Sequence, residues 1–236
     1  MMERGLVPSR ERAQALIIAG RVLVNEQKVE KPGQSVDSES AIRLLGEDLR
    51  YVSRGGLKLE RALEYWNIDV SDKRCMDVGA STGGFTDCML QHGAAKVIAV
   101  DTGYGQIEMK LRNDPRVTLL EKTNARYLQP KDVEPVEFAA MDVSFISATL
   151  VLPAVVEAAK PESVVVLVKP QFEVGREQIG KGGIVRDENA QTAAIGKVRD
   201  SLQQLGFTVR DPIESPILGA EGNREFLLYG MRSTAE

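Results

Sequence analysis

The chain has 236 residues, of which 43% are hydrophobic and 27% are charged. This composition is that of an ordinary folded protein, and the length suits one large domain or a medium domain with a small module. The net charge of -4 does not indicate a nucleic-acid partner, yet residues 1–58 carry ten Lys and Arg against eight Asp and Glu. A local basic surface is therefore compatible with the acidic average.

Scarce residue types exclude several classes of protein. Cys75 and Cys88 form no CxxC motif and favour a reducing, cytoplasmic location over a disulfide framework. A single histidine, His92, leaves no multi-histidine metal site and disfavours a serine–histidine hydrolase. The purest apolar run, Val164 to Val168, is too short to span a bilayer. We therefore expect neither a metal ion nor a membrane as partner.

The first predicted elements form a small helix-and-hairpin module. Ser9 is a suitable N-cap for a helix from Arg10 to Ala19, and short strands follow at 22–24, 28–29 and 41–45. Arginines on such a module can grip an RNA backbone through its phosphates, although a solvated charged face explains them equally well. The candidate RNA-binding residues are Arg4, Arg10, Arg12, Arg21 and Arg54.

A second helix is predicted from Arg54 to Trp66, with Ser53 as its cap. Its apolar residues recur at positions i, i+3, i+4 and i+7, which is the pattern of a helix face packed on a core. Lys58 lies at the border of that face. Its ammonium group could reach over a sheet edge into a cleft, or simply extend to solvent.

From Arg74 onward, predicted strands and helices alternate. This alternation with short connections is typical of an α/β fold with a mostly parallel sheet covered on both faces. A final strand, 225–229, is expected to run antiparallel. The strands before it are predicted at 74–78, 96–100, 117–120, 138–142, 164–168 and 208–209, with helices at 85–91, 106–112, 147–159 and 187–205.

A glycine-rich turn follows the first of these strands, within the segment Asp77 to Asp87. It lacks the lysine of a P-loop, and Gly79, Gly83 and Gly84 do not fit the G-x-G-x-x-G spacing of dinucleotide sites. A smaller nucleoside cofactor such as S-adenosylmethionine therefore fits best. A dinucleotide, or an ordinary loop without a ligand, is left open by the turn alone.

Other polar residues end the strands at the edge where open α/β sheets bind ligands. Asp101 is placed to accept hydrogen bonds from a ribose, and Asn124 with Ala125 follows the third strand, where an adenine would lie. Asp142 and Lys169 end the next two strands. Because an antiparallel strand begins where its parallel neighbours end, Glu225 belongs to the same edge, where a purely structural ion pair is the alternative.

Five motifs resemble those of the TlyA family, whose members are often labelled hemolysin A and are similar to FtsJ-type ribosomal RNA 2′-O-methyltransferases. The motifs cover nearly the whole chain. They are Asp-Val-Gly-Ala-Ser-Thr-Gly-Gly-Phe-Thr-Asp (77–87), Asn-Ala-Arg (124–126), Asp-Val-Ser-Phe-Ile-Ser (142–147), Val-Lys-Pro-Gln-Phe-Glu-Val-Gly (168–175) and Gly-Ala-Glu-Gly-Asn-x-Glu-Phe (219–226).

The resemblance implies a seven-stranded, Rossmann-like S-adenosylmethionine methyltransferase domain at residues 54–236. It also implies an RNA-binding module of the ribosomal protein S-four type at 1–46, with a linker at 47–53. Members methylate a cytidine ribose in the RNA of one or both ribosomal subunits. Because the sequence begins with Met1-Met2 in the last turn of a helix that opens the family's module, we expect a shortened module.

The resemblance further implies a Lys-Asp-Lys-Glu catalytic set, here Lys58, Asp142, Lys169 and Glu225. Lys169 is the expected base and Lys58 a neighbouring positive charge, while the two carboxylates orient them. The residues expected to bind the cofactor are Asp77, Gly79, Ala80, Ser81, Gly83, Gly84, Phe85, Asp101, Asn124, Ala125 and Asp142.

Three other hypotheses belong to different classes of protein. An RNA-binding protein with an inactive methyltransferase fold is the first, and a hemolysin-like membrane-active protein is the second. The membrane hypothesis is disfavoured because the sequence has no spanning segment. A dinucleotide oxidoreductase, the third, would bind nicotinamide cofactors and not S-adenosylmethionine.

Overall fold

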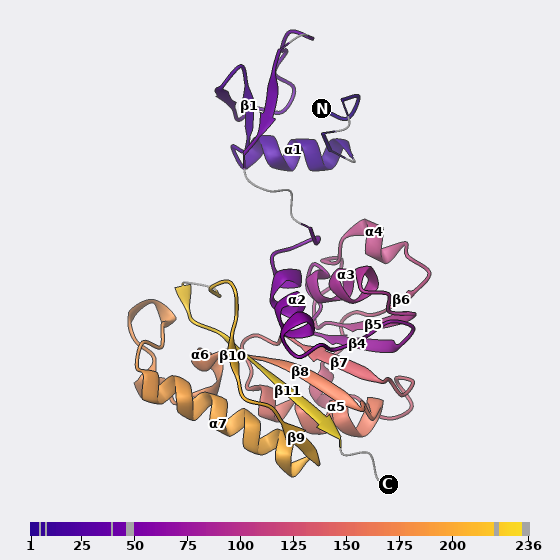
Figure 1. Cartoon of the computed structure of the whole chain (residues 1–236), viewed down its shortest axis with the longest axis vertical. Helices are drawn as coiled ribbons and strands as arrows, with labels where there is room; N and C mark the ends of the chain where they lie inside the picture. The colour runs from indigo at the N-terminus through magenta and orange to yellow at the C-terminus, as the bar shows by residue number, and fades with distance from the viewer. Residues whose placement is uncertain (5, 8, 39, 46–49, 220–221, 233–236) are drawn as a thin grey trace. The chain divides into compact units, whose positions relative to one another are not determined.

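The chain folds as two compact units, residues 1–49 and 50–236 (Figure 1). The computed structural model describes residues 1–4, 6–7, 9–38, 40–45, 50–219 and 222–232. Of the predicted linker 47–53, the described residues 50–53 belong to the second unit, and Tyr51 is buried there.

In its described residues, the first unit has one helix and a three-stranded antiparallel sheet with strand order β2-β1-β3. Its core is small and centres on Val7, Leu16 and Val22. Asn25 and Glu26 both have positive φ angles of 50° and 62°, which suits the tight turn between the first two strands. The elements are α1 (Arg10–Ile18), β1 (Val22–Val24), β2 (Gln27–Val29) and β3 (Ile42–Leu44).

The second unit is built on an eight-stranded sheet. The strand order is β10-β11-β8-β7-β4-β5-β6, and β9 also pairs with β11. The five strands from β4 to β8 are parallel, whereas β11 runs antiparallel to β8. The strands are β4 (Arg74–Val78), β5 (Lys96–Val100), β6 (Val117–Leu120), β7 (Phe138–Met141), β8 (Ser163–Val168), β9 (Phe207–Val209), β10 (Ile213–Glu214) and β11 (Phe226–Arg232).

The predicted α/β fold with an antiparallel last strand is therefore confirmed. The seven expected strands are all present, and the two-residue strand β10 is an addition. Its pairing with β11 through Ile213 and Leu227 is too short to leave an alternating pattern in the sequence.

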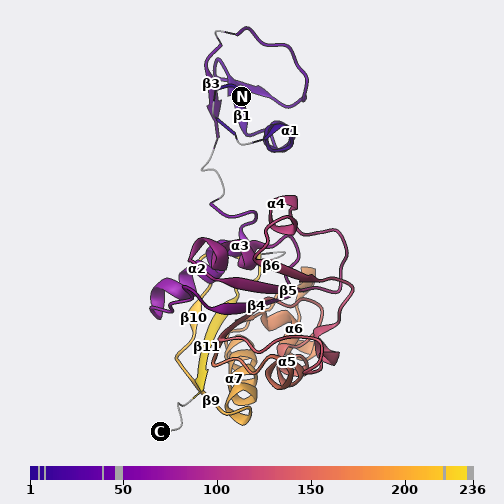
Figure 2. The same ribbon diagram turned by 90° about the vertical axis from the view of Figure 1, so that its right-hand side faces the viewer.

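Helices cover both faces of the sheet, as Figures 1 and 2 show. One apolar layer includes residues of α2 and α3, and the other includes residues of α5 and α7. The helices are α2 (Gly55–Tyr65), α3 (Gly84–Gln91), α4 (Met109–Arg112), α5 (Leu152–Ala159), α6 (Pro170–Glu173) and α7 (Glu188–Gln204), with short 3-10 turns η1 (Ala125–Tyr127), η2 (Ala148–Leu150), η3 (Arg176–Gln178) and η4 (Lys181–Gly183).

Three local predictions on the helices are wrong. The helix predicted at 106–112 starts only at Met109. Ser53 does not cap α2, because the N-cap position is Arg54 and no side-chain cap bond is made. Instead, a Cβ on Gly84 would lie 2.4 Å from the Ser53 hydroxyl oxygen, so this serine marks a close approach between the starts of α2 and α3. The predicted helix at 147–159 begins as η2 and becomes α-helical only at Leu152.

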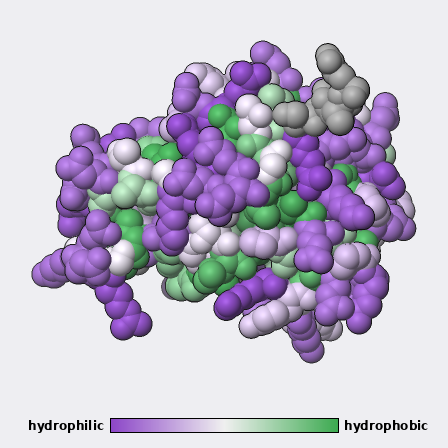
Figure 3. Space-filling view, turned by 90° about the horizontal axis from the view of Figure 1, so that it is seen from below, coloured by the Kyte–Doolittle hydropathy of each residue, from purple (hydrophilic) through white to green (hydrophobic). Residues whose placement is uncertain are grey.

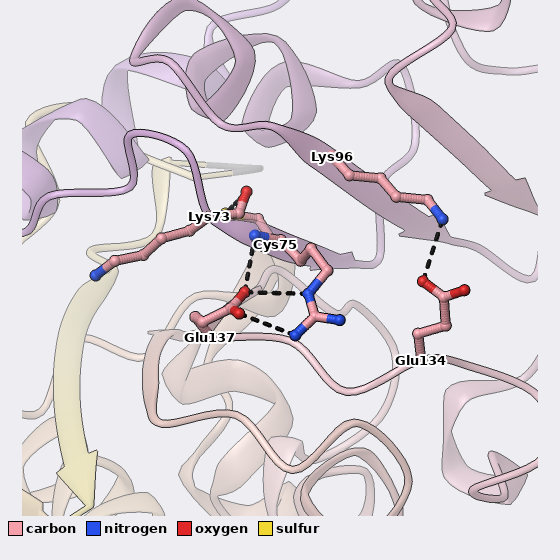
Figure 4. A network of polar contacts seen from close by, with 6 residues as sticks. Lys73, Cys75, Lys96, Glu134 and Glu137 are labelled. Carbon is pink, nitrogen blue, oxygen red and sulfur yellow. Dashed lines mark hydrogen bonds and ion pairs between the residues drawn. The ribbon is translucent and has the colours of Figure 1, made fainter.

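The amino ends of the parallel strands are joined by charged side chains (Figure 4). Glu137, just before β7, accepts from the backbone nitrogen of Arg74 at 2.8 Å and from its guanidinium at 2.9 Å. Lys96 and Glu134 form a second pair at 3.3 Å, and both side chains are exposed. This edge has a structural role and leaves the carboxyl edge for the site.

One face of the protein is more hydrophilic than hydrophobic (Figure 3). In the face shown in Figure 3, hydrophobic residues are grouped between larger areas of hydrophilic residues. None of the helices in the described ranges is both long and apolar enough to cross a bilayer.

Candidate active site

The glycine turn between β4 and α3 leaves no room for side chains at its closest point. Gly79 has a φ of 88°, and a Cβ there would lie 2.4 Å from the carbonyl oxygen of Asp142. Gly83, with a φ of 95°, occupies the N-cap position of α3. The turn therefore needs glycine at both positions, for close approach at the first and for left-handed backbone at both.

Asp77, at the end of β4, stabilises this turn through hydrogen bonds to the start of α3. The residue is fully buried, and its Oδ2 accepts from the backbone nitrogen of Thr86 at 2.8 Å and from the Thr86 hydroxyl at 2.6 Å. Burial raises the pKa of Asp77 to about 7, with the nearby charges of Asp142 and Asp101 adding to the rise and the Thr86 bonds opposing it. Asp77 thus gains or loses its proton close to neutral pH.

Replacing Asp77 by Asn should change how stability depends on pH. Between the ordinary pKa of 3.8 and the raised value of about 7, the folded chain binds one more proton at Asp77 than the unfolded chain does. The free energy of unfolding therefore falls as pH rises through this window. From about pH 5 to about pH 8, the wild type should lose roughly 2 kcal/mol relative to Asp77→Asn.

Urea unfolding at several pH values would measure this difference. The control is Asp211→Asn, because the Asp211 side chain is fully exposed. Curves for wild type and Asp77→Asn that run parallel across the window would contradict the raised pKa.

Two adjoining cavities flank the glycine turn, with volumes of about 280 Å³ and 320 Å³. Gly79, Ser81 and Asp142 line both of them. Of the residues predicted to bind a cofactor, all but Gly83 line one cavity or both. The first holds Asp77, Ala80, Gly84 and Phe85, and the second holds Asp101, Asn124 and Ala125.

Backbone bonds fix the polar groups of the second cavity. Asp101 accepts from the backbone nitrogen of Ser81 at 2.8 Å with one oxygen and from that of Gly103 at 2.6 Å with the other. The side chain of Asn124 accepts from the backbone nitrogen of Arg126 at 3.1 Å at the start of η1. The Asp101 carboxylate and the Asn124 amide are thereby held close to the carboxyl ends of β5 and β6.

The four charged residues of the predicted catalytic set lie together as two ion pairs. Lys169, directly after β8, lies 2.5 Å from a carboxylate oxygen of Asp142 and donates to the Ser144 hydroxyl at 2.7 Å. Lys58 of α2 donates to Glu225 at 2.6 Å, and both side chains are buried. Each lysine thus has its own carboxylate, whereas the sequence suggested Lys58 mainly as a neighbouring charge for Lys169.

A third cavity, of about 440 Å³, shares Lys58 with the first cavity and Ser144 and Phe145 with the second. It is lined by Lys58, Lys169 and Glu225, and by two aromatic residues, Phe145 and Phe172. The ring centroids of the two phenylalanines are 5.4 Å apart. Phe145 is 92% exposed although it is a large apolar residue. Sequence reasoning missed it, yet an aromatic residue among the polar residues after a strand was a usable signal.

A buried carboxylate connects the two walls of this third cavity. Glu173, at the end of α6, accepts from the backbone nitrogen of Ala148 at 2.7 Å and from the Ser147 hydroxyl. Lys197 of α7 lies 3.3 Å from the same carboxylate and donates to the Glu173 carbonyl at 2.9 Å. The segment after β7 and the segment after β8 are therefore held in one arrangement. The sequence did not single out this network.

The predicted RNA-binding arginines have different surroundings. Arg54 lines the 280 Å³ cavity, and Arg10 is exposed at the start of α1. Arg4 donates to the Ser40 carbonyl at 2.6 Å, and Arg21 donates to the Leu45 carbonyl at 2.8 Å. The last two therefore also support the first unit. Arg12 lies in α1, and its side chain is outside the described part of the structure.

Other chemistries find little support in the described residues. No group of three or more His, Cys, Asp and Glu side chains among them is placed to hold a metal ion. Burial raises the pKa of both cysteine thiols, Cys75 and Cys88, to about 12. Neither thiol is thus a candidate nucleophile.

Known proteins resemble this chain over nearly its whole length. Residues 51–232 match the FtsJ-like methyltransferase family, and residues 2–42 match the S4 domain. The chain is 44% identical over 232 residues to the 16S/23S rRNA (cytidine-2′-O)-methyltransferase TlyA of Mycobacterium tuberculosis, covering 97% of this chain and 87% of the relative. It is 41% identical to Hemolysin A of Brachyspira hyodysenteriae, covering 95% of each.

A solved structure extends the likeness to three dimensions. A protein provisionally called a hemolysin, from Streptococcus thermophilus, is 46% identical and superposes with a TM-score of 0.79, covering 99% of this chain and 86% of that one. The family match spans the second unit and the relatives span both units. The chain therefore belongs to the TlyA family of FtsJ-like methyltransferases.

Proposed function

We propose that this protein transfers a methyl group from S-adenosylmethionine to the 2′-hydroxyl of a cytidine in ribosomal RNA. The observation that carries this proposal is the position of the two lysine–carboxylate pairs. Asp142 lines both cavities of the glycine turn, Lys169 and Glu225 line the 440 Å³ cavity, and Lys58 lines the first and the third. A donor and an acceptor can thus meet at Lys169 and Asp142.

The residues around the glycine turn fit S-adenosylmethionine. Because a Cβ on Gly79 would fill the space next to Asp142, the turn can approach a ligand closely. Asp101 retains lone pairs that can accept from ribose hydroxyls, and the segment at Asn124 and Ala125 borders the place for an adenine. When bound, S-adenosylmethionine supplies an electrophilic methyl group on a sulfonium sulfur.

Lys169 is the group best placed to receive the proton of the ribose hydroxyl. As a neutral amine, Lys169 would take this proton while the 2′-oxygen accepts the methyl group. S-adenosylmethionine would supply that group and would leave as an uncharged thioether. Asp142, 2.5 Å away, then stabilises the ammonium. Ser144 accepts a hydrogen bond from Lys169 and so orients the nitrogen. General base catalysis of this kind contributes roughly 10²–10⁴ in rate.

The second ion pair, Lys58 and Glu225, lines the 440 Å³ cavity, which we call the acceptor cavity because it would hold the target nucleotide. Lys58 and Glu225 are buried together and come from α2 and from just before β11, far apart in the sequence. We assign to them the orientation of the ribose and its neighbouring phosphate.

The partner we propose is ribosomal RNA, free or within a ribosomal subunit, in the cytoplasm. Two observations support this choice. Residues 2–42 match the S4 domain, and the M. tuberculosis relative is named as an rRNA methyltransferase. Arg54, at the cavity next to the glycine turn, is a candidate for contacts with a phosphate.

Methyl transfer to ribosomal subunits tests the proposal. The full chain is incubated with labelled S-adenosylmethionine and subunits lacking ribose methylation, and the RNA is digested to nucleosides. We expect the label in 2′-O-methylcytidine. No incorporation into either subunit, or a label confined to base methyl groups, would contradict the proposal.

A further inference from the structure

Gln171 lies at the acceptor cavity, two residues after Lys169 and on the first turn of α6. It lines the 440 Å³ cavity together with Phe145, Phe172 and the two lysines. The side chain therefore borders the space into which the base of a bound nucleotide would extend from the ribose.

Each of the other polar side chains at this cavity has at least one partner, and Ser144 accepts a hydrogen bond from Lys169. Lys58 and Glu225 pair with each other, and Lys169 pairs with Asp142. Asn223 uses both ends of its amide, because it accepts from the backbone nitrogen of Val185 at 3.1 Å and donates to the Gly183 carbonyl at 3.0 Å.

Gln171 differs from these residues. Its side-chain oxygen Oε1 is buried and has no hydrogen-bond partner among the described residues. Leaving a buried acceptor unpaired costs on the order of 1–3 kcal/mol, so such atoms are rare unless a ligand completes them. The last torsion of a glutamine side chain is broad, and a modest rotation about it can present the oxygen to a ligand in the cavity.

We propose that Gln171 selects the base of the target nucleotide, with Oε1 accepting a hydrogen bond from the exocyclic amino group of cytosine. An unpaired acceptor requires a donor. Cytosine carries an amino group where uracil carries a carbonyl oxygen, so uracil would face Oε1 without a hydrogen. To bind uracil, the amide would have to turn by about 180° and present Nε2 instead. Phe145 and Phe172 offer ring faces on which an unstacked base can lie. This inference rests on the proposed function and assigns its base specificity to one side chain.

The test compares RNA substrates that differ at one nucleotide. The position methylated by the wild-type chain is mapped, and ribosomal RNA transcripts are prepared with C or U at that position. We expect the wild type to prefer C. In Gln171→Leu and Gln171→Ala, which both remove the acceptor, the ratio of kcat/KM for C over U should fall about tenfold or more.

Two further variants separate base selection from a structural role. Gln171→Glu keeps an acceptor for an amino group and should retain the preference for C. Gln203→Leu makes the same change as the leucine variant at an exposed position of α7 and should match the wild type. Because the readout is a ratio, a variant that is merely slower leaves it unchanged.

The outcomes distinguish the inference from the proposed function. A wild-type C-over-U ratio in the leucine and alanine variants would overturn the role of Gln171 while leaving the methyltransferase activity intact. Absence of methyl transfer by the wild type would overturn both.

Discussion

Lys169→Ala is expected to lower the rate of methyl transfer by roughly 10²–10⁴ while S-adenosylmethionine still binds. The variant loses the nitrogen that receives the proton and that contacts Asp142 and Ser144. The cofactor residues at the glycine turn, the segment at Asn124 and the cavity at Asp101 are unchanged. Single-turnover methyl transfer gives the rate, and calorimetric titration with S-adenosylmethionine gives the affinity.

A matched control for this change is Lys131→Ala, since Lys131 is exposed. It removes the same side chain from a surface position and should keep the wild-type rate. If Lys169→Ala transferred methyl groups as fast as Lys131→Ala, Lys169 could not be the base. If the affinity of Lys169→Ala for S-adenosylmethionine fell by the same factor as its rate, Lys169 would instead be assigned to cofactor binding.

Lys58→Met is expected to lower the free energy of unfolding by about 3–5 kcal/mol. Glu225 is only 2% exposed, and without Lys58 its carboxylate would stay buried with no positive partner. Restoring balance by the double change Lys58→Met and Glu225→Gln should recover much of this loss, because the remaining amide is neutral. Urea unfolding of the two single variants and the double variant measures the coupling between the residues.

The control for this experiment is the exposed ion pair at the opposite edge of the sheet. Lys96→Met removes the partner of Glu134 (Figure 4). The side chains of this pair are 37% and 64% exposed. Lys96→Met should lower the free energy of unfolding by less than about 1 kcal/mol. A cost for Lys58→Met no greater than that for Lys96→Met would mean that the buried pair contributes little to stability.

Much of the fold could be predicted because its signals are local. Buried parallel strands such as Val164 to Val168 are continuous apolar runs, and they alternate with helices at short intervals. Since parallel strands end at one edge, counting strands was enough to place Asp142, Lys169 and Glu225 near one another. Strand β10 and the role of Ser53 were missed because they depend on contacts between distant segments.

The partners within the site could not be read from residue types. That Lys58 would pair with Glu225 depends on the angle at which α2 crosses the sheet, and spacing along the chain does not encode this angle. Gln171, Phe145 and Glu173 belong to short segments without periodicity. Phe145 is notable because it is exposed, Glu173 because it is buried, and Gln171 because its Oε1 has no partner among the described residues. These properties are seen only in the coordinates.

The hydrogen bonds of Glu173 also determine how far the segments after β7 and β8 can move apart at the acceptor cavity. To separate the segment at Ala148 from the segment after Lys169, a buried carboxylate would have to leave its hydrogen bonds and the ammonium of Lys197. Because buried contacts have to break, such an opening is more costly than the motion of an exposed loop, and its population is correspondingly small. The two segments should therefore act as a fixed template, and adjustment during binding falls to the RNA.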